Sequence, residues 1–333
     1  MSTVSPTAPQ VPQVPGSGRP AAGAPSAAAR RRAGRTGRTG RHWTEHGLVF
    51  VAPFLAVYGL FLVWPFFSGI GMSLTSENIT ASGAAFVGLD NYAEAVRDPE
   101  VWSSLWNTVW FTVLSTVPLV VVGLGLALLA HQLRVVQWLW RLSWFAPFLL
   151  PSGVVCLLFA QMIYPSGFGL ADQLLASAGL EPGIGWLTDE RYAMLSIVLT
   201  TVWWTVGFNF LLYLAALQAI PQHLYEAAEL DGAGAWRRLW HITLPMLHRT
   251  TGLVLVLQVL ASLKIFDQVY LMTGGGPDDS TRPILQYVYQ QGFTGYRIGY
   301  ASAVSYLFFA LILTVSLVQP WLSRRRRAEE AAT

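Results

Sequence analysis

Few residues in this chain of 333 amino acids have types and spacings that could do chemistry. His42, Glu45 and His46 fit the His-x-x-Glu-His pattern of one zinc protease class. They stand between an arginine-rich segment and a long apolar run, where no folded domain would supply a third ligand. Interfacial anchoring is therefore the favoured interpretation. The single cysteine, Cys156, excludes an intramolecular disulfide and a cysteine-cluster metal site, so no metal site is predicted.

Residues for hydrolysis are equally scarce. A phosphate-binding loop of the Gly-x-x-x-x-Gly-Lys-Ser/Thr type needs a lysine, and the only lysine, Lys264, falls inside an apolar run. A membrane enzyme would need a nucleophile or metal set, and no Ser-His-Asp or Cys-His pattern is recognisable. The chain is therefore predicted not to be an enzyme and to bind no cofactor of its own.

The elements that would position these residues are apolar helices. Hydrophobic residues make up 53% of the chain and charged residues 12%, about half the charged fraction of a typical soluble domain. Six stretches are long enough to cross a bilayer as helices: 48–70, 107–130, 142–164, 193–215, 251–273 and 301–322. None has the strict alternation of a barrel strand. The predicted fold class is an all-α membrane protein with six transmembrane helices.

The arginines predict the orientation. They concentrate in 1–47, 131–141, 216–250 and 323–333. Because Lys and Arg are retained on the cytoplasmic side, both termini are predicted to be cytoplasmic in a multi-pass plasma membrane protein. Residues 1–42 are predicted to be a disordered Pro/Ala/Arg-rich tail, residues 43–322 the six-span domain, and 323–333 a basic tail. The run Arg30–Arg32 is interpreted as a topology anchor, and no nucleic acid partner is expected.

The segment 216–250, between the fourth and fifth spans, has the most specific pattern. Pro221 is suited to open a helix, residues 222–230 are good helix formers, and Gly232 supplies a left-handed stop. A second short helix is predicted over 235–244. Ala227 and Ala228 leave a shallow surface that another backbone could approach, and the hairpin is too apolar for a plain connector.

These residues resemble the EAA loop of ABC importer permeases. The matching motif is Glu226-Ala227-Ala228, then Gly232, then Ile242-x-Leu244-Pro245. Further blocks are similar to carbohydrate permeases of the maltose and glycerol-3-phosphate type: Phe86 to Tyr92, Asn107-Thr108, Trp186 to Asp189, Phe266-Asp267, Thr273 to Pro277 and Gly299 to Ala303. The resemblance covers about residues 45–325. It implies the type I ABC importer permease fold, with 216–250 as a cytoplasmic coupling loop carrying the EAA helices.

The resemblance also implies that the chain works with other chains. These would be a second, homologous permease subunit, two cytosolic ATPase subunits that bind ATP and Mg, and an extracytoplasmic sugar-binding protein that contacts outer segments including 73–106 and 274–300. The EAA helices would dock in a cleft of an ATPase. The coupling residues implied are Tyr225, Glu226, Ala227, Ala228, Glu229, Asp231 and Gly232.

The resemblance places the sugar pathway along the fourth and fifth spans. Counting from the motifs selects Thr201, Trp204, Thr205 and Phe208 on the fourth span and Gln258, Ala261, Ser262 and Ile265 on the fifth. Both sets follow the i, i+3, i+4, i+7 spacing of one helix face; helix–helix packing is the alternative interpretation. Asn209 and Trp203 are secondary candidates. Lys264 and Asp267, three apart, are expected to pair, and both a structural role and a substrate contact stay open.

Two functional hypotheses follow. The first is a permease subunit of an ATP-driven, binding-protein-dependent sugar importer that forms half of the translocation pathway. The second is an ion-coupled secondary transporter, which would require inverted repeats, interrupted helices and several buried carboxylates. Of the carboxylates, only Asp267 lies within a predicted span, and this favours the first hypothesis.

Overall fold

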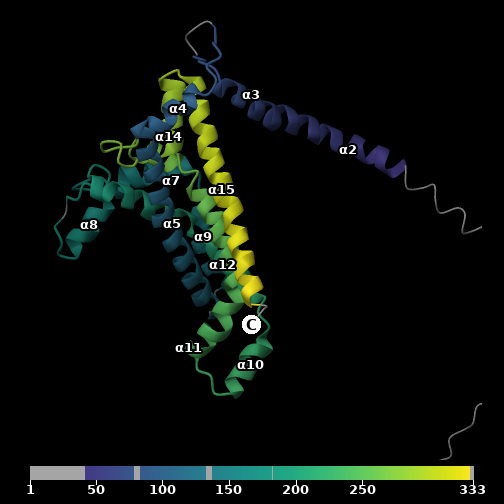
Figure 1. Ribbon diagram of the computed structural model, residues 1–333. Coiled ribbons are helices and arrows are strands. Elements are labelled where there is room, and N and C mark those ends of the chain that lie inside the picture. The colour runs from purple at the N-terminus through teal and green to yellow at the C-terminus, as the bar shows by residue number, and fades with distance from the viewer. Residues whose placement is uncertain (1–41, 79–82, 133–136, 182, 331–333) are drawn as a thin grey trace, which may run out of the picture. The chain divides into compact units, whose positions relative to one another are not determined.

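The computed structural model describes residues 42–78, 83–132, 137–181 and 183–330, and their side chains except those of 42–49, 137 and 318–330 (Figure 1). The arginine-rich tail and the side chains of the His42–His46 pattern therefore lie outside the described part. The chain divides into two compact units after Pro65. The first contains α2 (His42–Tyr58) and η1 (Gly59–Val63), and α3 (Trp64–Ser73) starts at the boundary.

In the part of the second unit that the structure describes, the named elements are all helices, joined by loops. Its elements are α4 (Asp90–Arg97), α5 (Pro99–Gln132), α6 (Gln137–Phe145), η2 (Ala146–Leu149), α7 (Ser152–Leu158), η3 (Phe159–Ile163), α8 (Leu170–Ser177), α9 (Glu190–Gln218), α10 (Gln222–Leu230), α11 (Ala235–Arg238), η4 (Leu239–Thr243), α12 (Leu244–Ser262), α13 (Asp267–Met272), α14 (Ile284–Tyr289), η5 (Gln290–Thr294) and α15 (Ile298–Glu330). One isolated antiparallel bridge joins Thr75 and Phe86. The predicted all-α class is confirmed.

Five helices are long and apolar enough to cross a membrane: Phe50–Ser73, Pro99–Gln132, Glu190–Gln218, Ala235–Ser262 and Ile298–Leu317. A sixth candidate is a pair, Trp138–Leu149 and Ser152–Ile163, bent by 94°. The bend lies at Leu150, whose extended backbone (φ −74°, ψ 140°) fits the residue before a proline. The described helices thus provide five or six spans, in agreement with the six predicted.

The helix of the expected fifth span differs in its bounds. It begins at Ala235 and ends at Ser262 instead of covering 251–273. Its first turns include the separate short helix expected over 235–244, since the π turn η4 ends at Thr243 and α12 follows it at Leu244 without a break. Pro245 is accommodated in the first turn of α12, where a proline needs no N–H partner. Lys264 and Ile265 then donate their N–H groups to Ala261 and Ser262 in i−3 turns that end the helix.

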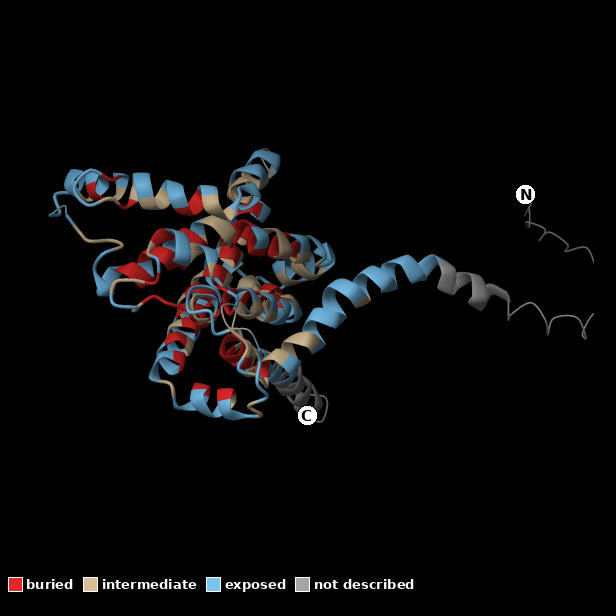
Figure 2. Cartoon of the chain, turned by 90° about the horizontal axis from the view of Figure 1, so that it is seen from above, coloured by how far each residue is buried: buried red, intermediate tan, exposed pale blue. Residues whose placement is uncertain are grey.

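The core of the second unit lies where α5, α9 and α12 run side by side (Figure 1). Buried side chains there include Leu119 on α5, Phe210 and Tyr213 on α9, and Val254 on α12. Figure 2 shows buried residues gathered where helices meet and exposed residues on the outer sides of the helices. This polarity leaves long apolar exteriors on the bundle, as expected for helices that face lipid or another membrane subunit.

The two ends of the bundle differ. Figure 1 places α10 and α11 at one end and α4 and α14 at the other. At the α4–α14 end, the side chain of Arg282 lies 3.0 Å from Glu100 and 3.0 Å from Asp279. Tyr287 and Tyr300 both donate hydrogen bonds to the carboxylate of Asp98. These contacts connect α14 and the loop before it to the start of α5 and to α15.

Candidate functional site

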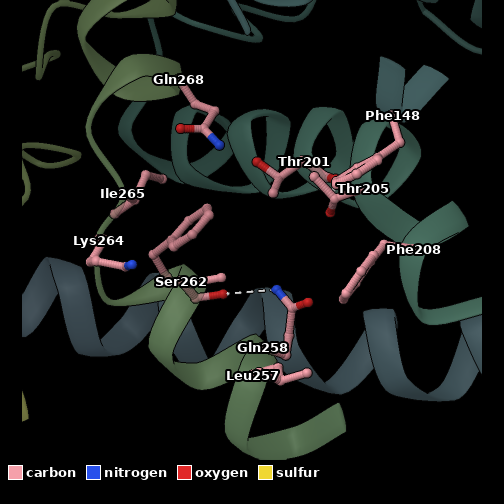
Figure 3. A pocket seen from close by; sticks show the side chains of 12 residues that line it. Phe148, Thr201, Thr205, Phe208, Leu257, Gln258, Ser262, Lys264, Ile265 and Gln268 are labelled. Carbon is pink, nitrogen blue, oxygen red and sulfur yellow. Dashed lines mark hydrogen bonds between the residues drawn. The ribbon is translucent and has the colours of Figure 1, made fainter. Parts of the chain in front are cut away.

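A cavity of about 240 Å3 lies between α9 and the end of α12 (Figure 3). Elements α5, η2 and α13 close its other sides. The lining side chains combine aromatic rings, hydroxyls, amides and one ammonium group: Phe111, Phe148, Thr201, Thr205, Phe208, Leu257, Gln258, Ala261, Ser262, Lys264, Ile265 and Gln268. Such a mixture of apolar walls with a few polar groups is typical of a small-molecule site.

The structure brings together seven of the eight residues predicted for the pathway, since only Trp204 does not line this cavity. The indole Nε1 of Trp204 instead donates to the carbonyl of Leu150, 3.2 Å away at the bend before α7. The other seven were selected by the resemblance, and the helical period keeps those of each helix on one face, which the structure turns toward this cavity. The direction of Trp204 depends on the bent pair, which spacing along α9 does not reveal.

The cavity also contains residues that the prediction missed. Phe148 comes from η2, and Gln268 comes from α13 after the break in the chain. Pro147 and Pro151, which flank the bend, were the available sequence signal for the position of Phe148. For Gln268 no such signal exists, because its place depends on where α12 ends.

Two hydroxyl groups of the cavity lining donate hydrogen bonds to backbone carbonyls of α9. Thr201 Oγ1 donates to the carbonyl of Ile197 at 2.8 Å, and Thr205 Oγ1 donates to the carbonyl of Thr201 at 2.7 Å. Each oxygen keeps lone pairs free to accept a hydrogen bond. A ligand hydroxyl could therefore donate to this side of the cavity.

Asn209, a secondary candidate from the sequence, is 1% exposed and does not line the cavity. Its amide Nδ2 donates to Gln258 Oε1 at 3.2 Å, and this hydrogen bond fixes the orientation of a residue that lines the cavity. Trp203, the other secondary candidate, packs against Phe159 with a ring separation of 5.2 Å and is also absent from the lining.

Lys264 and Asp267 do not form the expected pair in the structure. No ion pair of Lys264 occurs among the described residues, and Asp267 Oδ2 accepts a hydrogen bond from Ser152 Oγ at 2.8 Å. The expectation assumed one continuous helix, whereas α12 ends at Ser262 and α13 starts at Asp267. The break separates the two side chains and leaves Lys264 in the cavity lining.

The second candidate site is the hairpin of α10 and α11 at one end of the bundle. The prediction of a helix over 222–230 with a left-handed stop is confirmed: α10 covers Gln222–Leu230, and Gly232 has φ +75°. The N–H of Ala233 donates to the carbonyl of Ala228 at 2.8 Å, which closes the end of the helix. The hairpin is thus a defined structural element.

The seven residues expected to couple the hairpin to a partner have two kinds of environment. Tyr225 points toward the bundle, where its hydroxyl lies 3.0 Å from Thr243 Oγ1, and Ala228 is half-buried. Exposed members are Glu226, Ala227, Glu229, Asp231 and Gly232. Glu229 lies 3.3 Å from Arg238 on α11. The exposed surface continues onto Leu230 and Trp236, which the prediction missed.

Comparisons with known proteins agree with one another. The family model "Binding-protein-dependent transport system inner membrane component" matches residues 92–328. The sulfoquinovosyl glycerol transport system permease protein SmoG of Agrobacterium fabrum is 37% identical over 81% of this chain and 88% of its own length. The trehalose/maltose transport system permease protein MalF of Thermococcus litoralis is 34% identical over 84% and 94%. Similarity to curated proteins thus extends over most of the chain.

A solved structure has the same fold. It is a chain of a bacterial ABC transporter involved in the import of the acidic polysaccharide alginate, with a TM-score of 0.73 and 23% identity, covering 86% of this chain and 96% of that one. The sn-glycerol-3-phosphate transport system permease protein UgpA of Agrobacterium fabrum is a further relative, 33% identical over 81% of this chain and 91% of its own length.

Proposed function

Because the chain belongs to the family of binding-protein-dependent transport system inner membrane components, we propose that it is the permease subunit of an ATP-driven importer of sugars or sugar derivatives. The family is a membrane transport component and not an ATPase. ATP and Mg are therefore expected on two separate ATPase chains, and a second permease would supply the other half of the pathway. The relatives include a trehalose/maltose and an sn-glycerol-3-phosphate transport system permease.

The observation that carries the sugar assignment is the composition of the α9–α12 cavity. Phe148 and Phe208 supply flat apolar faces, while Thr201, Gln258 and Gln268 supply hydrogen-bonding groups. A sugar has both apolar ring faces and hydroxyl groups, so it needs both kinds of contact. Seven of the eight predicted pathway residues support this assignment because they line one cavity.

Coupling is assigned to the exposed surface of the α10–α11 hairpin. Glu226 and Asp231 offer negative charge to basic groups of an ATPase, and Ala227 allows close approach of a partner backbone. Tyr225 links α10 to η4 at the start of the long helix that ends at Ser262. A movement of the ATPase against the hairpin would then shift this long helix, whose far end lines the cavity. Such coupling requires two states of the bundle whose balance the ATP sites change.

The orientation follows the arginine distribution. The hairpin end and both termini are assigned to the cytoplasm, within a six-span domain over 43–322 that contains the coupling loop 216–250. Segments 73–106 and 274–300 would then face the external binding protein. An ion-coupled mechanism has no support among the relatives, whose family works with binding proteins.

Co-purification tests the proposal. The tagged chain, expressed in its native cells and extracted in mild detergent, should bring down an ATPase subunit and a second permease. Glu226→Lys should greatly reduce ATPase recovery while membrane insertion stays normal. Glu190→Lys, an equal charge change at the opposite end of the bundle, should leave recovery unchanged. Normal ATPase recovery with Glu226→Lys would refute the coupling role of this hairpin.

A further inference from the structure

We infer that the substrate of the α9–α12 cavity carries a negatively charged group, a carboxylate, sulfonate or phosphate, which Lys264 binds. The inference rests on the proposed function and narrows its substrate class. It depends on three features of the cavity: the direction of the Lys264 side chain, the lack of a counterion for it among the described residues, and the distribution of rings and polar groups around it.

Lys264 is the only lysine in the chain and the only ionisable side chain in the described lining of the cavity. Figure 3 shows its ammonium end pointing into the cavity beside Ser262 and Ile265. Lys264 lies in the turn between α12 and α13, where its N–H donates to the carbonyl of Ala261. The cavity therefore contains one positive charge and no negative charge from its described lining.

The nearest carboxylate in the sequence does not neutralise Lys264. Asp267 accepts from Ser152 instead, and none of the ion pairs among the described residues includes Lys264. Lys264 lies two residues past Ser262, where the long helix ends, and its side chain is exposed to the cavity. A bound anion would form charge-assisted hydrogen bonds with its ammonium group, which are stronger than those to a neutral hydroxyl.

The rest of the cavity is arranged for a ligand with a charged end and a ring. In Figure 3, Phe148 and Phe208 lie on the side opposite Lys264, with Thr201 and Thr205 between them. The rings can cover the face of a sugar while the hydroxyls accept from its OH groups. Gln268, another residue of the lining, adds amide N–H donors for an oxyanion. Sugar acids, sulfosugars and sugar phosphates share this chemistry.

Equilibrium binding to the assembled transporter tests the inference. The purified complex is titrated with radiolabelled D-glucose and with three charged probes on the same ring, D-glucuronate, glucose 6-sulfate and glucose 6-phosphate. At least one charged probe should bind about tenfold more tightly than glucose, the gain expected from one charge-assisted contact. The preference should fall as ionic strength rises, because salt screens the attraction.

Variants test whether Lys264 supplies the charge that favours the anionic probes. Lys264→Gln should reduce the ratio of charged-probe affinity to glucose affinity to about one, whereas Lys264→Arg should retain most of this preference. Arg191→Gln, the loss of one positive charge at the start of α9 outside the cavity lining, should leave it unchanged. The salt dependence of the unaltered complex tests the inference even where Lys264→Gln does not assemble.

Two results would overturn the inference. One is that no charged probe binds more tightly than glucose. The other is an unchanged preference in Lys264→Gln. Neither result affects the proposed function, because recovery of the ATPase and second permease with the tagged chain is measured separately.

Discussion

Asn209 Nδ2 donates a hydrogen bond to Gln258 Oε1 over 3.2 Å, and this bond joins α9 to α12 behind the cavity. Gln258 Nε2 in turn donates to Ser262 Oγ at 3.1 Å, as Figure 3 shows. Ser262 Oγ lies 3.0 Å from Ser115 Oγ on α5. One polar network therefore connects three helices and fixes which way the Gln258 amide faces.

Replacing Asn209 by leucine removes the amide but keeps a similar volume. Gln258 Oε1 then loses a buried donor, so Asn209→Leu should lower the free energy of unfolding by about 1–2 kcal/mol, the range for polar contacts between membrane helices and for unpaired buried groups. The measurement is the thermal unfolding midpoint of the detergent-solubilised complex. Thr205→Val, which removes only a hydrogen bond within α9, should shift the midpoint less. Equal shifts would contradict the role of the network.

Gly207 marks a close approach between α9 and the backbone at the end of α6. A Cβ at this position would lie 2.1 Å from the carbonyl oxygen of Trp144. Gly207→Ala should therefore destabilise the protein by about 1–3 kcal/mol, the usual cost of overpacking. Gly125→Ala, on α5 with no atom within 4 Å of the added Cβ, should be neutral or slightly stabilising because alanine favours a helix. Folded yield and unfolding midpoint measure both variants, and a Gly207→Ala protein as stable as Gly125→Ala would contradict the close approach.

The segment around α8 should be sensitive to pH through Asp172. Its carboxylate accepts hydrogen bonds from the N–H groups of Gly167 and Gly183 and from Trp186 Nε1. These bonds, above all that from Gly167, hold the pKa of Asp172 below its ordinary value of 3.8, although burial opposes this. Because the folded pKa is the lower one, the stabilisation is complete above the unfolded pKa and is lost as pH falls through the folded pKa.

Hydrogen exchange of residues 165–186, corrected for intrinsic rates, measures this effect. Protection in the unaltered protein should be constant near neutral pH and should decrease below about pH 3.8, the ordinary aspartate value. Asp172→Asn should show reduced protection at every pH, because the neutral amide has only one acceptor oxygen and cannot replace the charged carboxylate in all three hydrogen bonds. Protection that does not change with pH in the unaltered protein would show that Asp172 does not hold this segment.

Local signals in the sequence were sufficient for the bounds of α10. Pro221 and Gly232 bound this helix because proline suits a helix start and glycine tolerates the positive φ that ends it. For the cavity, the family resemblance selected the stripe that includes Thr201, Thr205 and Phe208, and the helical period keeps these residues on one face of α9. The structure places all three in the lining of one cavity.

The parts that could not be predicted depend on packing between distant segments. Whether α12 continues beyond Ser262 is decided by its neighbours, so the pairing of Lys264 with Asp267 was expected from a helix that does not exist there. Trp204 turns toward Leu150 because of a bend in another helix pair. Asn209 was a secondary pathway candidate, but its partner Gln258 lies 49 residues away, beyond the reach of spacing rules.

Photo-crosslinking from the α10–α11 hairpin is the most direct test of the proposed permease role. Cys156 is the only cysteine and is buried, so a Cys156→Ala background accepts a benzophenone maleimide at one chosen site, Glu226→Cys or the control Glu190→Cys. Irradiation of the assembled complex should join position 226 to a chain with a phosphate-binding loop, identified by mass spectrometry, and should give no such product from position 190. Absence of an ATPase adduct from position 226, or equal yields from the two positions, would contradict the account.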